Sequence, residues 1–123
     1  MDRKTKVLIV DDDDNALATL IDLLEVYGFN SVCAKNGQEA ITIFENEAPD
    51  VVLLDTRLPR INGYEVCERL KEKTNGKVKI VLYTAYAELV DIKRAKEAGA
   101  DEFISKTEDF SNMLNILKKI GKR

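Results

Sequence analysis

Four consecutive aspartates, residues 11–14, follow directly after a strand-like apolar run. Adjacent carboxylates repel one another, so such a cluster at the end of a buried strand lowers stability unless a cation offsets the charge. Mg²⁺ is the natural candidate, because this hard cation prefers oxygen ligands. We therefore predict that Asp11 and Asp12 bind Mg²⁺, and that Asp13 or Asp14 caps the helix that follows.

Three further strand-like runs also end in residues suited to ion or phosphate chemistry. They are residues 51–54 before Asp55, residues 79–83 before Thr84, and residues 102–105 before Lys106. Taken singly, each has a simpler explanation, as a turn aspartate, a β-forming threonine or a solvated lysine. Their joint placement predicts instead that Asp55 is a nucleophile that forms an acyl phosphate. Lys106 would then balance the anionic phosphoryl oxygens, and Thr84 would donate a hydrogen bond to one of them.

Two residues are expected at the mouth of this site. Arg57 lies two residues after Asp55, and Tyr86 follows the fourth strand-like run closely. The backbone carbonyl of Arg57 would complete the protein ligands of the Mg²⁺ ion, of which Asp55 is also one. We predict that the side chains of Arg57 and Tyr86 hinder the water that would hydrolyse the acyl phosphate. The alternative is that both point into solvent.

The elements that must position these residues alternate regularly along the chain. Apolar runs predict five strands, at about residues 6–10, 31–35, 51–54, 79–83 and 102–105. Between and after them, apolar residues at helical spacing predict five helices. Residues 51–54 are apolar throughout, as in strands buried on both faces of a parallel sheet. The pattern predicts a parallel sheet with helices on both faces, whose strand ends meet at the edge where ligands bind.

Composition narrows the range of functions. The chain has 123 residues, of which 45% are hydrophobic and 33% charged, so we expect one domain over residues 1–123 with its core at about 6–120 and no output domain. A net charge of −3 argues against nucleic acid as a direct partner. No apolar stretch is long enough to span a membrane and no signal peptide is visible, so we expect a cytoplasmic protein. Histidine is absent, and the two cysteines have no metal-binding or redox spacing.

Several short motifs resemble those of the receiver domains of two-component response regulators, over about residues 6–120. They are Val10-Asp11-Asp12, Val52-Leu53-Leu54-Asp55 with Leu58-Pro59 and Asn62-Gly63 behind it, Tyr83-Thr84-Ala85, Ala98-Gly99-Ala100-Asp101 and Phe103-Ile104-Ser105-Lys106. The resemblance implies a five-stranded, flavodoxin-like (βα)5 doubly wound α/β fold. It also implies Mg²⁺-dependent phosphorylation of Asp55 by a partner histidine kinase or phosphotransfer protein.

The resemblance further implies a switch made of Thr84 and Phe103. Thr84 would move toward the phosphoryl group, Phe103 would rotate into the space it leaves, and the partner-binding face would change its affinity. The chain departs from the family pattern at Thr107, where a proline usually follows the lysine. A cis bond before a residue other than proline costs about 2.5–4 kcal/mol, so we expect either a trans bond with a shifted loop or a strained exception.

The favoured interpretation is a phospho-accepting signalling domain that assists its own phosphorylation and dephosphorylation but is not a turnover enzyme. The main alternative is an unphosphorylated docking module of the same fold. A phosphatase of the haloacid dehalogenase type would need a second acid at the position of Arg57, and four aspartates would repel the phosphate of a flavin. We expect a resting monomer, with a dimer possible on phosphorylation, that acts on an effector protein or through an output domain missing from this chain.

Overall fold

A five-stranded parallel sheet forms the centre of the molecule. The computed structural model describes residues 4–85, 88–106 and 110–121. The strands are β1 (Lys6–Val10), β2 (Asn30–Ala34), β3 (Val51–Asp55), β4 (Lys79–Thr84) and β5 (Glu102–Ser105). Their order in the sheet is β2-β1-β3-β4-β5, and every neighbouring pair is parallel. This order is that of the flavodoxin-like fold, so the predicted fold class is confirmed.

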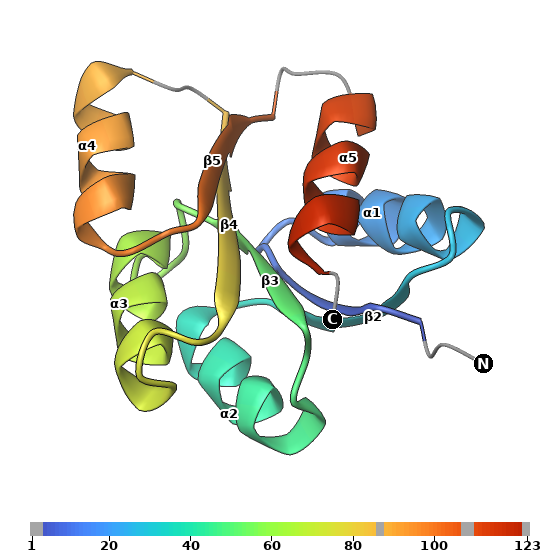
Figure 1. Ribbon diagram of the computed structural model, residues 1–123, viewed down its shortest axis with the longest axis horizontal. Coiled ribbons are helices and arrows are strands. Elements are labelled where there is room, and N and C mark those ends of the chain that lie inside the picture. The colour runs from blue at the N-terminus through green and yellow to red at the C-terminus, as the bar shows by residue number, and fades with distance from the viewer. Residues whose placement is uncertain (1–3, 86–87, 107–109, 122–123) are drawn as a thin grey trace.

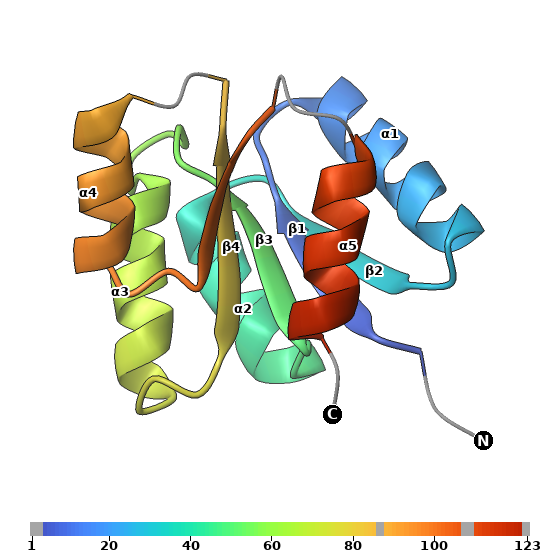
Figure 2. The same ribbon diagram turned by 45° about the horizontal axis from the view of Figure 1, so that its top comes forward.

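Helices cover both faces of the sheet. They are α1 (Asp14–Val26), α2 (Gly37–Glu47), α3 (Gly63–Lys73), α4 (Leu89–Glu97) and α5 (Phe110–Ile120). One face packs against α1 and α5, and the other against α2, α3 and α4 (Figure 1, Figure 2). None of these helices in the described part of the chain combines the length and apolar character needed to cross a bilayer.

The strand side chains divide between two cores by simple alternation. In β3, Val52 and Leu54 belong to the core beneath α2, α3 and α4, whereas Val51 and Leu53 belong to the core beneath α1 and α5. All five residues of β3 are buried, because helices cover both faces of the sheet. The uninterrupted apolar run in the sequence therefore predicted this strand correctly.

Two strands extend one residue beyond their predicted ends. Asp55 pairs with Tyr83, and Thr84 pairs with Ser105, so Asp55 and Thr84 are the last residues of β3 and β4 rather than loop residues. In contrast, β2 lies one residue earlier than predicted. The ladder thus fixes the backbone of two candidate site residues directly.

Two Asn-Gly pairs, Asn36-Gly37 and Asn62-Gly63, lie at the starts of α2 and α3. The side chain of Asn36 accepts a hydrogen bond from the Glu39 amide at 2.9 Å, and that of Asn62 accepts one from the Glu65 amide at 3.0 Å. Both asparagines are therefore N-caps, and the glycine that follows each is the first helical residue. Asp13 caps α1 in the same way, as predicted.

The role of Asn36 as the N-cap of α2 can be tested directly. Replacing Asn36 by Ala removes an acceptor for an otherwise unpaired helical amide, and we expect the free energy of unfolding to fall by about 1 kcal/mol. Asn36→Asp keeps the acceptor and should stay close to wild type. Urea denaturation followed by circular dichroism measures both. An equal loss in both variants would contradict the cap.

Candidate functional site

Three carboxylates gather where β1 and β3 end. Val10 pairs with Leu54 in the ladder, which brings the following residues, Asp11 and Asp55, side by side. One oxygen each from Asp11, Asp12 and Asp55 lies within 4.8 Å of the others. Asp11 and Asp55 are buried and Asp12 is exposed, so the cluster reaches from the sheet to solvent. The predicted group of acids is thus assembled.

Asp11 is held through both of its carboxylate oxygens. Its Oδ1 accepts a hydrogen bond from the Asp13 amide at 3.0 Å. Its Oδ2 accepts one from the Tyr83 hydroxyl at 2.5 Å and one from Lys106 Nζ at 3.2 Å. The contact with Tyr83 has the short length of a hydrogen bond to an ionised oxygen. The carboxylate is therefore fixed in orientation although it is fully buried.

Asp55 is held in a similar way but lacks a hydroxyl donor among the described contacts. Its Oδ1 accepts a hydrogen bond from the Arg57 amide at 2.9 Å, and its Oδ2 accepts one from Lys106 Nζ at 3.0 Å. Burial raises the pKa of Asp55, the charge of Asp11 adds to this rise, and the two hydrogen bonds oppose it. Desolvation is the largest of these effects.

Lys106 is the cation that joins the two buried acids. Its amide donates to the Thr84 carbonyl at 2.6 Å, which extends the β4–β5 ladder and aims the side chain at the cluster. Its ammonium also lies 4.7 Å from the centre of the Tyr83 ring, a cation–π distance. Burial alone would lower the pKa of Lys106, but hydrogen bonds and charge from Asp55 and Asp11 outweigh it and raise the pKa. The lysine is therefore charged at neutral pH.

Gly63 allows the chain behind Asp55 to close against the strand. Its amide donates to the Thr56 carbonyl at 3.0 Å. A Cβ atom at this position would lie 2.1 Å from the backbone oxygen of Asp55, far inside van der Waals contact. Only glycine fits here, and its presence lets the first turn of α3 support the end of β3.

The remaining candidate residues lie around this centre. Thr84 is buried on the α3–α4 side and borders a cavity of about 410 Å³ that is also lined by Arg57, Tyr64 and Arg94. Phe103 is partly buried against the core of the same side. The side chain of Arg57 is exposed.

Two sequence predictions fall on residues that the structure does not describe. They concern Tyr86 as a barrier to water and the peptide bond between Lys106 and Thr107. The described residues do place Lys106 in the site, since its ammonium contacts both buried carboxylates.

Tyr83 is a site residue that the sequence analysis missed. It was counted only as part of an apolar run and of a family motif, yet its hydroxyl makes the shortest of the described contacts with Asp11. The signal was available in the alternation of β4. If Thr84 faces one side of the sheet, the residue before it faces the other, which is the side from which Asp11 is approached.

The arrangement supports phosphoryl chemistry on a carboxylate. Asp55 offers a nucleophilic oxygen, Asp11 and Asp12 offer ligands of the kind that a divalent cation prefers, and Lys106 offers positive charge for anionic oxygens. Residues 7–118 match the family described as the response regulator receiver domain. The chain belongs to this family. It is a phospho-accepting signalling domain rather than a turnover enzyme.

Similar proteins fall into full-length regulators and solved receiver domains. The receiver domain is 36% identical over 104 residues to the "Probable transcriptional regulator ycf27" of Porphyra purpurea, covering 85% of this chain and 42% of that protein. It is 32% identical over 114 residues to the "Regulatory protein AtoC" of Escherichia coli K12, covering 93% of this chain and 24% of that protein. The chain thus spans less than half the length of either regulator.

Solved structures agree over nearly the whole chain. The BeF3-activated N-terminal receiver domain of Klebsiella pneumoniae RstA has a TM-score of 0.90 at 27% identity, covering 97% of this chain and all of that one. A putative response regulator from Chloroflexus aurantiacus J-10-fl also has a TM-score of 0.90, at 30% identity, covering 98% of this chain and 99% of that one.

The free energy of unfolding tests whether Lys106 stabilises the two buried acids. Lys106→Ala leaves two buried carboxylates without their shared cation, and we expect the free energy of unfolding to fall by about 1–3 kcal/mol at neutral pH. Because folding raises the pKa of Lys106, the contribution is present at neutral pH and is lost only as the pH rises through that raised value.

Lys35→Ala is the matched control for this measurement. Lys35 pairs with Asp14 at 2.7 Å, but both side chains are largely exposed, so its removal should change stability by less than about 1 kcal/mol. Urea denaturation at pH 7 in metal-free buffer compares the two variants. An equal loss of stability in both variants would show that Lys106 stabilises the fold no more than an exposed lysine does.

Proposed function

We propose that Asp55 accepts a phosphoryl group from the phosphohistidine of a partner kinase or phosphotransfer protein. In this transfer a P–O bond forms to an Asp55 carboxylate oxygen and the P–N bond to the partner's histidine breaks. The single observation that carries the proposal is the contact of one ammonium, Lys106, with both Asp55 and Asp11. Such an ammonium can stabilise the negative charge of the free carboxylate and, after transfer, that of the phosphoryl oxygens.

The reaction is expected to depend on Mg²⁺. Three carboxylates within 4.8 Å carry more negative charge than Lys106 neutralises, and exposed Asp12 opens the cluster to solvent, so this donor set fits a hard divalent cation. Asp11, Asp12 and Asp55 would hold the ion together with the backbone carbonyl of Arg57. When bound, it would supply positive charge that screens the phosphoryl oxygens from the acids.

Thr84 and Phe103 form the proposed switch. Phe103 pairs with Leu82 and Thr84 with Ser105 across β4 and β5, so Thr84 and Phe103 face the same side of the sheet. A cavity of about 250 Å³ lies beside Phe103 between α4 and β5, and another lies beside Thr84. Both residues therefore have space next to them on the side of α4.

The partner-facing surface is proposed to include α4. Leu89 and Val90 at its start are highly exposed for apolar side chains. A change in Thr84 and Phe103 would alter how α4 and β5 present such residues to an effector protein or to an output domain of a longer chain. We propose a monomer at rest, with dimerisation on phosphorylation as one way of signalling.

Intact mass spectrometry tests the phosphorylation proposal. Incubation of wild type with acetyl phosphate and Mg²⁺ should add about 80 Da, as expected for one phosphoryl group in an acyl phosphate. The gain should vanish without Mg²⁺ and in Asp55→Asn. Asp22→Asn, a change of an exposed aspartate in α1, should keep it. No gain in wild type under any condition would favour the unphosphorylated docking module.

Arg57 and Tyr86 are proposed to slow hydrolysis of the acyl phosphate. The exposed side chain of Arg57 borders the same cavity as Thr84, a position from which it can obstruct approaching water. The double change Arg57→Ala, Tyr86→Ala should raise the rate of phosphate loss severalfold, followed by mass after the phosphodonor is removed. An unchanged rate would mean that both side chains only face solvent.

A further inference from the structure

The Tyr83 hydroxyl reaches Asp11 from a strand that does not neighbour β1. Tyr83 lies in β4, Asp11 follows β1, and β3 lies between them. Neighbouring strands are about 4.8 Å apart, so two such steps separate the backbones by roughly 10 Å. The long and rigid tyrosine side chain spans this gap and ends 2.5 Å from Asp11 Oδ2. A phenylalanine would fill the same space but would lose this contact.

Strand alternation aims this side chain at the acids. Tyr83 belongs to the core beneath α1 and α5, and Leu53, two residues before Asp55, belongs to the same core. Thr84 borders the cavity on the opposite, α3–α4 side. Two consecutive residues of β4 therefore approach the site from opposite faces of the sheet.

The donors to Asp11 Oδ2 differ in one respect that matters for a cation. Lys106 carries a positive charge, which repels a metal ion, whereas the Tyr83 hydroxyl is neutral. A tyrosine hydroxyl ordinarily keeps its proton at neutral pH. It can orient the carboxylate without opposing the charge of an incoming ion.

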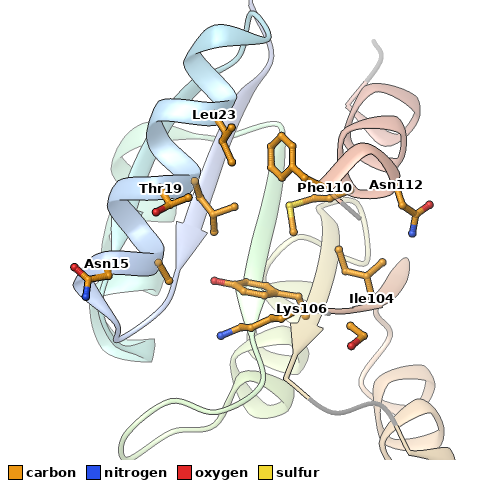
Figure 3. A pocket seen from close by; sticks show the side chains of 12 residues that line it. Asn15, Thr19, Leu23, Ile104, Lys106, Phe110 and Asn112 are labelled. Atoms are coloured by element: carbon orange, nitrogen blue, oxygen red, sulfur yellow. The ribbon is translucent and has the colours of Figure 1, made fainter. Parts of the chain in front are cut away.

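The Tyr83 side chain is almost fully buried, and it also contacts Asp11 and Lys106. On the side of α1 and α5 the ring borders a cavity of about 360 Å³, which is also lined by Leu20, Phe110 and Met113. Lys106 lies at one end of this cavity, with Phe110 and Leu23 toward the other (Figure 3). Core packing and the contacts with Asp11 and Lys106 together hold the ring in place.

We propose that Tyr83 is a positioning residue for the metal: its hydroxyl holds the Asp11 carboxylate in the orientation that binds Mg²⁺. The inference rests on the proposed function, since it assigns the cation to the same carboxylates. Groups that orient a metal ligand in this way typically change metal affinity by 10–100-fold when they are removed. Tyr83→Phe should therefore weaken Mg²⁺ binding about 10-fold.

The phosphoryl-transfer step itself should be spared. Tyr83→Phe leaves the ring beneath Lys106 and changes no atom of Asp55. At saturating Mg²⁺ the rate of phosphorylation should stay close to wild type, while the Mg²⁺ concentration that gives half of that rate rises about 10-fold. A merely structural role would not separate these two quantities.

A thermal unfolding experiment measures Mg²⁺ affinity without any phosphodonor. The melting temperature of each protein is followed against MgCl2 concentration, because a ligand that binds only the folded state raises it. Tyr64→Phe is the matched control, since Tyr64 is also buried but lies in the core on the opposite face of the sheet, where it borders a cavity with Thr56 and Asp91. It should keep the wild-type affinity. A cooperative transition in metal-free buffer shows that each variant is folded.

A second variant separates the hydroxyl from the ring. Tyr83→Leu lacks both, and its Mg²⁺ affinity should match that of Tyr83→Phe. Wild-type affinity in Tyr83→Phe, or tighter binding, would overturn the proposal, as would a loss confined to Tyr83→Leu. If wild type itself bound no Mg²⁺ and gained no 80 Da, the proposed function would fail as well. If wild type did both and Tyr83→Phe matched it, only this inference would fail.

Discussion

The burial of negative charge is the main physical constraint on the structure of this receiver domain. Asp11 and Asp55 lie side by side at the ends of neighbouring strands and have little access to water. Taking carboxylates out of water is costly, and two of them in contact repel one another. Within the described chain, Lys106 is the cation that contacts both. The cluster therefore keeps an excess of negative charge, which a divalent cation would offset.

The topology supplies the groups that offset this charge from distant parts of the chain. Lys106 is 95 residues from Asp11, and Tyr83 is 72 residues from it. Parallel strands point the same way, so the ends of β1, β3, β4 and β5 all come to one edge. Gly63 then lets α3 approach the end of β3 without a clash. The same ladder that builds the core thus brings the site residues together.

The sequence predicted the parts that depend on pattern. Alternating apolar runs identified the strands, and the polar residues at their ends identified the acids and Lys106, because position along a parallel strand determines position at the edge. The N-caps at Asn36 and Asn62 were not identified, since an Asn-Gly pair suits both a turn and a helix N-cap, and tertiary packing of the following residues decides between them. Tyr83 was missed because a tyrosine in an apolar run is indistinguishable from a core aromatic until its neighbours across the sheet are known.

The two consecutive residues Tyr83 and Thr84 point to opposite sides of the sheet at the end of β4. Tyr83 points to the α1–α5 side, where its hydroxyl is tied to a buried carboxylate. Thr84 points to the α3–α4 side, where it borders a cavity. A shift of Thr84 toward a phosphoryl group would therefore leave Asp11 and its donors in place. Because side chains alternate along the strand, a change on the α4 side would leave the geometry of the three carboxylates intact.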